Sequence, residues 1–326
     1  MKGRSAVTLT EPDDSGRRIA AVDALRGVAI AAMIIYHFSW NLDDLGIVQM
    51  DVKYGVEWTA FARTIAGTFI GLAGVSLVLA TRRGFRFRPF GWRLAKIVAA
   101  AVLVSLASWY MVPNAYVFFG ILHLIAFGSV VALPFLRLPT AAVLLVAIAV
   151  LAAPFFYKSA LFNPPFLWWV GFTPRPPASI DYVPVFPWFA MILFGVVAGR
   201  LLTSFGMQSR FARWQPVGMA GRIAVGAGRW SLLIYLAHIP LIIAVLSPFA
   251  MSGSRSEAAM FTQECVTSCR AAERDSPVCE AYCACALSGV QDAGLLSSLL
   301  SGRMSADEDI QWLTIAGQCR LMEPLP

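Results

Sequence analysis

The sequence predicts an all-α integral membrane helical bundle of about seven transmembrane helices, followed by a small, disulfide-stapled helical tail. The first observation is composition: 58% of the 326 residues are hydrophobic and only 14% are charged. Soluble domains are about 45–50% apolar and about 25% charged. The second observation is a series of apolar stretches that are long enough to cross a bilayer. The third is that all six cysteines lie after residue 250.

The expected membrane spans are apolar segments close to the length of about 17–25 residues that crosses a bilayer. We place them at residues 20–40, 58–80, 94–112, 116–135, 140–157, 184–201 and 230–248. The sixth should begin at the prolines of "DYVPVFPWF", because proline is favoured in the first turn of a helix. The chain is therefore divided into an N-terminal segment 1–17, a membrane domain 18–248 and a tail 249–326.

The uneven distribution of basic residues predicts the orientation of the chain. Residues 1–250 contain 21 of the 26 Lys and Arg but 9 of the 19 Asp and Glu, a net charge of +12, whereas the tail carries −5. With the N-terminus in the cytoplasm, 17 of the 21 basic residues fall on the cytoplasmic side, as the positive-inside rule requires. We expect a multi-pass protein of a bacterial inner membrane, with a cytoplasmic N-terminus and a periplasmic tail.

Membrane lipid is the partner that explains the remaining charge pattern best. The run "RRGFRFRPFGWR", residues 82–93, combines basic and aromatic side chains. We interpret it as a cytoplasmic loop held by anionic lipid and expect no nucleic-acid partner. The outer loop 158–183 is rich in proline and aromatic residues. It forms either a partial lid on the membrane surface or an interfacial aromatic belt.

Polar residues in the first span point to the interior of the bundle. A helix advances about 100° and 1.5 Å per residue, so Asp23, Arg26, His37 and Asn41 share one narrow stripe. Arg26 and His37 are about 16 Å apart along this helix. Asp23 and Arg26 can form a purely structural ion pair. A neutral imidazole near the outer end of the span can act as a base or a nucleophile near neutral pH.

The three histidines of the chain all fall in expected spans. His37, His123 and His238 are each explained by an interior hydrogen bond, but together they predict a shared polar pocket. Asp181 can orient a histidine or bind an amine or hydroxyl. Arg63 can bind an oxyanion or a phosphate, although the small residues that follow it are also explained by close helix packing. No histidine pair has i,i+4 spacing, so we expect no metal site.

The tail contains two C-x3-C motifs, in "CVTSCRAAERDSPVCEAYCAC". Residues i and i+4 share one face of a helix, so two helices joined by "RDSP" bring Cys265 opposite Cys283 and Cys269 opposite Cys279. This arrangement resembles the helical hairpin of twin C-x3-C proteins. Cys285 and Cys319 form a possible third pair. "SADE" at residues 305–308 is a capping box that begins another helix. Disulfides persist outside the cytoplasm, whereas a cytoplasmic tail would favour zinc.

Five segments occur in an order that resembles the heparan-alpha-glucosaminide N-acetyltransferase catalytic family. They are "VDALRGVAIAAMIIYHFSW", "FIGLAGVSL", "GILHLIAF", "DYVPVFPWFAMILFG" and "GRWSLLIYLAHIPL". The resemblance covers about residues 18–245 and implies a membrane acyltransferase that takes acetyl from cytoplasmic acetyl-CoA. The acceptor is expected to be an amine or hydroxyl of an envelope sugar or a lipid headgroup. A histidine after the first span is implicated in the family, and His37 fits that position.

These considerations define the candidate site residues. We expect His37, His123, His238 and Asp181 to act in catalysis, Arg26 and Arg63 to bind the acetyl-CoA donor, and Asn41 and Trp188 to bind the acceptor. Two other classes of function stay open. The histidines can serve as proton relays in a transporter, or the chain can be a non-catalytic assembly subunit. The tail can bind a protein partner or cover the mouth of the site.

Overall fold

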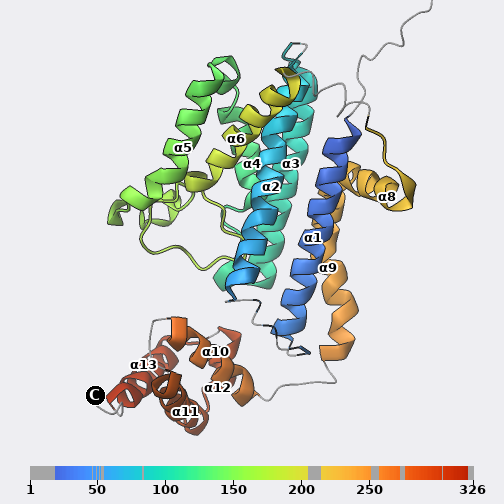
Figure 1. Cartoon of the computed structure of the whole chain (residues 1–326). Coiled ribbons are helices and arrows are strands. Elements are labelled where there is room, and N and C mark those ends of the chain that lie inside the picture. Colours follow the sequence, from blue (N-terminus) through green and yellow to red (C-terminus); the bar gives the residue numbers. More distant parts are fainter. Residues whose placement is uncertain are drawn as a thin grey trace, which may run out of the picture.

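The computed structural model is helical throughout the part of the chain that it describes. It describes residues 19–321 except 46, 49, 51, 53–54, 83, 205–213, 251–256, 272–275 and 303, and contains no strand among them. The expected N-terminal segment 1–17 lies outside the described residues. Figure 1 shows an elongated bundle with a separate group of short helices at one end.

Five of the seven expected spans are helices long enough and apolar enough to cross a membrane, so the chain is a multi-pass membrane protein. Their bounds are α1 (Ala20–Asp44), α2 (Val56–Thr81), α3 (Phe87–Met111), α6 (Val185–Ser204) and α9 (Ser231–Ala250, apolar to Phe249). Helix α5 (Thr140–Phe156) has 17 residues and is at the lower limit of a span.

The expected span over residues 116–135 is wrong as a single membrane-crossing helix. Helix α4 (Ile121–Val131) has 11 residues, or about 16 Å at 1.5 Å per residue, about half of a bilayer core of about 30 Å. The short 3-10 helices η1 (Pro113–Ala115) and η2 (Pro134–Arg137) flank it. Proline lacks the amide hydrogen that continues a helix, and α4 ends at Val131, three residues before Pro134.

Helix α3 also differs from the expectation, because it begins at Phe87 rather than at residue 94. Most of the run 82–93 is therefore the first two turns of this helix and not a loop. Pro89 lies in the first turn, where a proline costs no helical hydrogen bond. The rings of Phe85 and Phe90 pack with centroids 5.2 Å apart, which holds the chain at the start of the helix.

Two helix pairs approach so closely that their backbones touch, which explains the small residues of the sequence. A Cβ atom on Gly74 of α2 would lie 2.1 Å from the Ile192 carbonyl oxygen of α6. Helix α8 (Gly218–Arg229) packs against α1 in the same way: a Cβ on Gly27 would lie 1.9 Å from the Ala224 carbonyl oxygen. Small residues permit such crossings in membrane bundles. These contacts fix the register of α1 against α8 and of α2 against α6.

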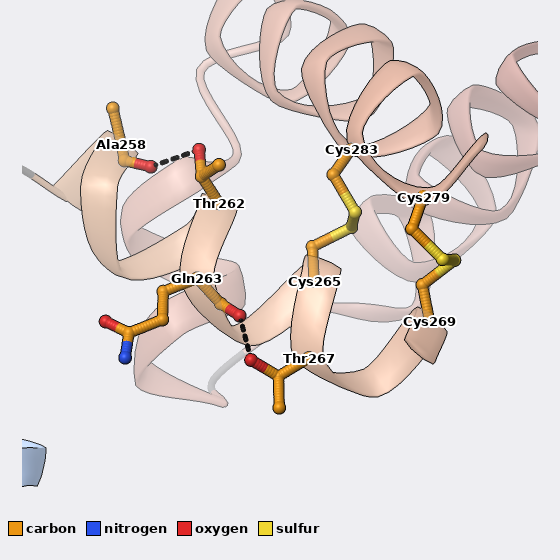
Figure 2. Close-up of a disulfide and its surroundings, with 8 residues drawn as sticks. All are labelled: Ala258, Thr262, Gln263, Cys265, Thr267, Cys269, Cys279 and Cys283. Atoms are coloured by element: carbon orange, nitrogen blue, oxygen red, sulfur yellow. Dashed lines mark hydrogen bonds between the residues drawn. A yellow bond between two sulfur atoms is a disulfide. The ribbon is translucent and has the colours of Figure 1, made fainter. Parts of the chain in front are cut away.

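The described part of the tail forms four helices. They are α10 (Glu257–Ala271), α11 (Ser276–Asp292), α12 (Leu296–Ser301) and α13 (Ala306–Leu321). Three disulfides join the cysteines of α10, α11 and α13. Figure 2 shows the bonds between Cys265 and Cys283 and between Cys269 and Cys279, which confirm the predicted pairing, and a third bond joins Cys285 to Cys319.

The predicted capping box at the start of α13 is also confirmed. The Ser305 amide donates to the Glu308 carboxylate over 2.6 Å, and the Glu308 amide donates to the Ser305 hydroxyl over 3.3 Å. The Asn114 side chain of η1 donates to the Gly302 carbonyl over 2.8 Å, so the tail contacts the end of the bundle where α1 and α9 both finish (Figure 1).

Candidate functional site

Two groups of polar side chains occupy the bundle at different depths along α1. The charged layer consists of Asp23, Arg26, Ser76, Arg93 and Arg229. The histidine layer consists of His37, His238, Tyr235 and Asp181. The α1 members Asp23 and His37 are 14 positions apart, which corresponds to about 21 Å along the helix axis. Both layers therefore interrupt an otherwise apolar interior, one near each end of α1.

Asp23 is the centre of the charged layer. Its side chain is buried, and one carboxylate oxygen lies 3.2 Å from Arg26 Nη1, which confirms the predicted ion pair. The other oxygen lies 3.7 Å from Arg229 Nε at the end of α8. Arg26 also donates to the hydroxyl of Ser76 on α2. A buried carboxylate is stable only when it is paired, and this one has a cation at each oxygen.

Arg93 adds a further positive charge from α3. It is half-buried and close enough to Arg26 for the two guanidinium groups to repel each other. The charged layer therefore holds three arginines against one carboxylate. Guanidinium groups bind phosphate through two parallel hydrogen bonds. An excess of arginine at the end of a bundle is suited to an anionic ligand, because such a ligand relieves the repulsion.

The histidine layer begins with a pair of imidazole rings. The ring centroids of His37 on α1 and His238 on α9 are 4.9 Å apart. His238 Nδ1 lies 2.5 Å from the Tyr235 carbonyl oxygen. A carbonyl can only accept, so Nδ1 carries the hydrogen and Nε2 carries the lone pair. His238 is 6% exposed, and Nε2 is buried without a hydrogen-bond partner among the described residues.

Asp181 joins the histidine layer from the segment that precedes α6. Its carboxylate accepts the Ile121 amide over 3.0 Å and the Tyr235 hydroxyl. Burial is the main cause that raises the pKa of Asp181 to about 6, and the two hydrogen bonds oppose this shift. A Cβ on Gly120 would lie 2.2 Å from the Asp181 carboxylate. Only glycine at position 120 leaves room for the carboxylate at the start of α4.

His123 occupies a separate, hydrogen-bonded position. Its Nδ1 accepts the Gly120 amide over 3.2 Å, and its Nε2 lies 3.3 Å from the Ser105 hydroxyl oxygen. That hydroxyl donates its own hydrogen to the Val117 carbonyl, so His123 Nε2 is the donor. Both nitrogens of His123 are thus used to hold the first turn of α4. Among the described residues, no hydrogen bond or ring contact joins His123 to the other two histidines.

The remaining sequence candidates lie outside these contacts. Arg63 is exposed on α2. The Asn41 amide donates back to the His37 carbonyl over 2.7 Å. Trp188 packs against the core formed by α2, α4 and α6. No group of three or more His, Cys, Asp or Glu side chains in the described part of the chain is placed to hold a metal ion.

Sequence reasoning missed Tyr235, Arg93 and Arg229. Tyr235 precedes His238 by three positions, which places both on one helical face, and that spacing was a usable signal. In the sequence, Arg93 is the last residue of the basic run 82–93, and Arg229 is one of the basic residues in the membrane domain. Their approach to Asp23 and Arg26 depends on the packing of α3 and α8, for which the sequence carries no local signal.

The outer loop contributes to the site through its last residues. The Val183 amide donates to the Phe119 carbonyl over 2.9 Å, and the Tyr182 hydroxyl donates to the Trp168 carbonyl over 2.7 Å. These bonds hold Asp181 near the start of α4. Leu161 and Phe166, earlier in the loop, are more than 70% exposed, as in an interfacial aromatic belt. The loop thus has an outward apolar part and an inward polar end.

Comparison with known proteins relates this arrangement to one family. Residues 18–240 match the model of the family described as heparan-alpha-glucosaminide N-acetyltransferase, catalytic. The match covers about two thirds of the chain, includes both polar layers and ends before the tail. No curated protein and no solved structure matches the chain. The chain therefore belongs to the heparan-alpha-glucosaminide N-acetyltransferase catalytic family.

Proposed function

We propose that this protein is a membrane-embedded acyltransferase that moves an acetyl group from acetyl-CoA to an acceptor on the opposite side of the membrane. The acceptor is an amine or hydroxyl of an envelope sugar or of a lipid headgroup. The observation that carries the proposal is the contact between His37 and His238, with ring centroids 4.9 Å apart, inside the region that matches an acetyltransferase family.

The histidine pair supplies the proton chemistry that acyl transfer needs. In one route, His238 Nε2 removes the proton of the acceptor while the acceptor nitrogen or oxygen bonds to the acetyl carbon. In the other, a neutral His37 attacks the acetyl carbon first and forms an acetyl-histidine, which the acceptor then cleaves. In both routes the carbon–sulfur bond of the donor breaks, and the thiolate leaves and takes up a proton. Both routes begin with a free lone pair on His238 Nε2.

The charged layer is proposed to bind the phosphates of the donor. The sequence predicts that Arg26 binds the donor, but Arg26 already contacts Asp23 and Ser76. We therefore add Arg93 and Arg229 as residues that bind the phosphates. Phosphate groups close to these guanidinium groups would offset the positive charge that one carboxylate leaves uncompensated. Asp23 and His37 are about 21 Å apart along α1. This distance would separate the phosphates of the donor from its thioester, which lies at the other end of an extended arm.

The proposed orientation places the charged layer on the cytoplasmic side and the tail in the periplasm of a bacterial inner membrane. The bias of basic residues supports it, and disulfides persist outside the cytoplasm. Reporter fusions at Gly84 and Ala258 test it, and we expect cytoplasmic and periplasmic signals respectively. The same side for both positions would contradict transfer across the membrane.

The experiment that tests the function uses purified protein in lipid nanodiscs with acetyl-labelled acetyl-CoA. We expect release of free CoA that depends on an added amino sugar or lipid headgroup, together with label in the acceptor. A parallel assay in liposomes separates the rivals. Label that crosses the membrane without loss of the thioester would indicate a transporter, and no turnover of any acceptor would favour an assembly subunit.

A further inference from the structure

Tyr235 makes two hydrogen bonds in different directions from the same turn of α9. Its backbone carbonyl accepts from His238 Nδ1 over 2.5 Å. Its hydroxyl donates to the carboxylate of Asp181. The ring centroids of Tyr235 and His238 are 5.6 Å apart, so the tyrosine ring also lies beside the imidazole. One residue thus contacts His238 and ties its helix to a different part of the bundle.

The turn of α9 that carries His238 is one where the helix is locally weakened. Pro240 lies inside α9, and proline has no amide hydrogen to bond the carbonyl four residues earlier. Helices commonly bend at such a point. A histidine two residues before a proline therefore needs additional contacts to keep one orientation, and Tyr235 provides them.

The other end of the link is itself fixed. Asp181 accepts the Ile121 amide at the start of α4, and Gly120 leaves no room for a side chain at that point. The link from Tyr235 to Asp181 therefore joins α9 to α4 and to the segment before α6. Among the described residues, no side-chain hydrogen bond joins His37 on α1 to α4 or to the segment before α6. The distance between the two imidazoles therefore depends on the position of α9.

We propose that Tyr235 is a positioning residue for acyl transfer: its carbonyl holds His238 in the Nδ1–H tautomer, and its hydroxyl, through Asp181, keeps His238 Nε2 beside His37. This inference rests on the proposed function, since it assigns a role to His238 in the same reaction. Tyr235 does not touch the reacting atoms. It acts through the tautomer and the orientation of His238.

The test replaces Tyr235 by phenylalanine, which removes the hydroxyl and keeps the ring and the carbonyl. We expect Tyr235→Phe to lower kcat at least tenfold with little change in the KM for acetyl-CoA, because donor binding lies in the other layer. Tyr36→Phe is the matched control: the Tyr36 ring also contacts a histidine of the pair, at 5.2 Å from His37, and its kcat should stay within twofold. Asp181→Asn, which keeps an acceptor oxygen, should retain more activity than Asp181→Ala.

A second readout does not depend on activity. Nitrogen-15 NMR of histidine-labelled protein distinguishes the two neutral tautomers, and His123→Gln and His37→Gln assign the signals of the three histidines. We expect the Nδ1–H tautomer for His238 in the wild type and, because the carbonyl is retained, in Tyr235→Phe as well. The His238 Nε2 signal of Tyr235→Phe should shift and broaden, because the ring is no longer held in one orientation beside His37.

The two readouts separate the positioning role from the function itself. A Tyr235→Phe variant with unchanged kcat and an unchanged His238 Nε2 signal would overturn the positioning role. If the wild type transfers no acetyl group, the proposed function fails, and the His238 Nε2 signals of the wild type and Tyr235→Phe alone then decide whether Tyr235 positions His238.

Discussion

The charged layer and the histidine layer lie on the same helix, yet they satisfy their polar groups in different ways. In the charged layer both oxygens of Asp23 face arginines, at 3.2 and 3.7 Å. In the histidine layer hydrogen bonds hold Asp181 and His238 Nδ1, and the buried His238 Nε2 has no hydrogen-bond partner among the described residues. Asp23 Oδ2 makes no hydrogen bond there either, but it lies within ion-pair distance of Arg229. A buried group without a partner is costly, and such groups are typical of functional sites.

The difference teaches where chemistry is to be expected. A layer with paired charges holds helices together and can recognise a charged ligand at its edge, but its groups are already occupied. A layer with an available lone pair can accept a proton from a substrate. Substitutions in the two layers should therefore fail in different ways: one set should affect stability or donor binding, and the other should affect turnover.

The largest effect on activity is expected at His37. His37→Ala should reduce acetyl transfer by more than tenfold, a barrier increase above about 1.4 kcal/mol, because it removes one imidazole of the pair. Folding and membrane insertion should be unchanged, since His37 is only partly buried. The measurement is kcat in nanodiscs, with Glu57→Gln, an exposed side chain on α2, as the control. Activity above a tenth of the wild type would assign the catalytic role to another histidine.

Asp23→Ala should act on stability instead. It leaves Arg26 inside the bundle without its carboxylate, and loss of one partner of a buried ion pair costs about 3–5 kcal/mol. The free energy of unfolding, measured by titration with a denaturing detergent, reports this loss. The double variant Asp23→Ala/Arg26→Met should recover much of it, because the more buried of the two paired guanidinium groups is then also removed, whereas the Arg229 side chain is 53% exposed and can be solvated. A loss below about 1 kcal/mol in the single variant would mean that water reaches the charged layer freely.

The tail provides a third kind of stabilisation, by covalent bonds next to the end of α1 that carries the histidine layer. Cys265→Ser/Cys283→Ser should destabilise the tail by about 2–4 kcal/mol and leave the melting temperature of the bundle nearly unchanged. The bond between Cys285 and Cys319 remains as an internal control. Mass spectrometry of non-reduced peptides from intact cells should find all three bonds. Free thiols or bound zinc would count against a periplasmic tail.

Asp181 allows a test by pH, because its pKa is raised to about 6 in the folded protein from 3.8. The folded state then binds the proton more tightly than the unfolded state, so this contribution to stability is complete below about pH 4 and is lost as pH rises through 6. Each pKa unit is about 1.4 kcal/mol, so a shift of this size corresponds to a loss of roughly 3 kcal/mol. The unfolding free energy of Asp181→Asn should lack this decline, and parallel curves for both proteins would refute the assignment.

The smallest effect is expected for donor binding at the edge of the charged layer. Arg93→Gln should raise the KM for acetyl-CoA about tenfold and leave kcat nearly unchanged, since one charge-assisted hydrogen bond contributes about 1.5 kcal/mol. The effect should weaken at high salt. Arg88→Gln, on the exposed side of the same helix, is the matched control. An equal increase of KM in both variants would indicate a general surface attraction rather than a site.

Local patterns in the sequence were enough to predict several features. Apolar length predicted the five long spans, since bilayer thickness sets the minimum length of a helix. The ion pair of Asp23 and Arg26 followed from i,i+3 spacing. The pairing of the tail cysteines followed from i,i+4 spacing on two antiparallel helices. Each of these depends on residues close in the chain, or on one short hairpin, so helical periodicity alone decides it.

Only the tertiary structure decided which distant residues meet. His37 and His238 are about 200 positions apart, and the link from Tyr235 to Asp181 joins two segments that sequence spacing does not relate. Their contacts depend on the register in which α1, α8 and α9 cross, and backbone contacts such as Gly27 against Ala224 set that register. His123, identical in type, is held elsewhere by Gly120 and Ser105. Residue type therefore identified the candidates, and helix packing selected among them, because a side chain can react only with what the packing brings within reach.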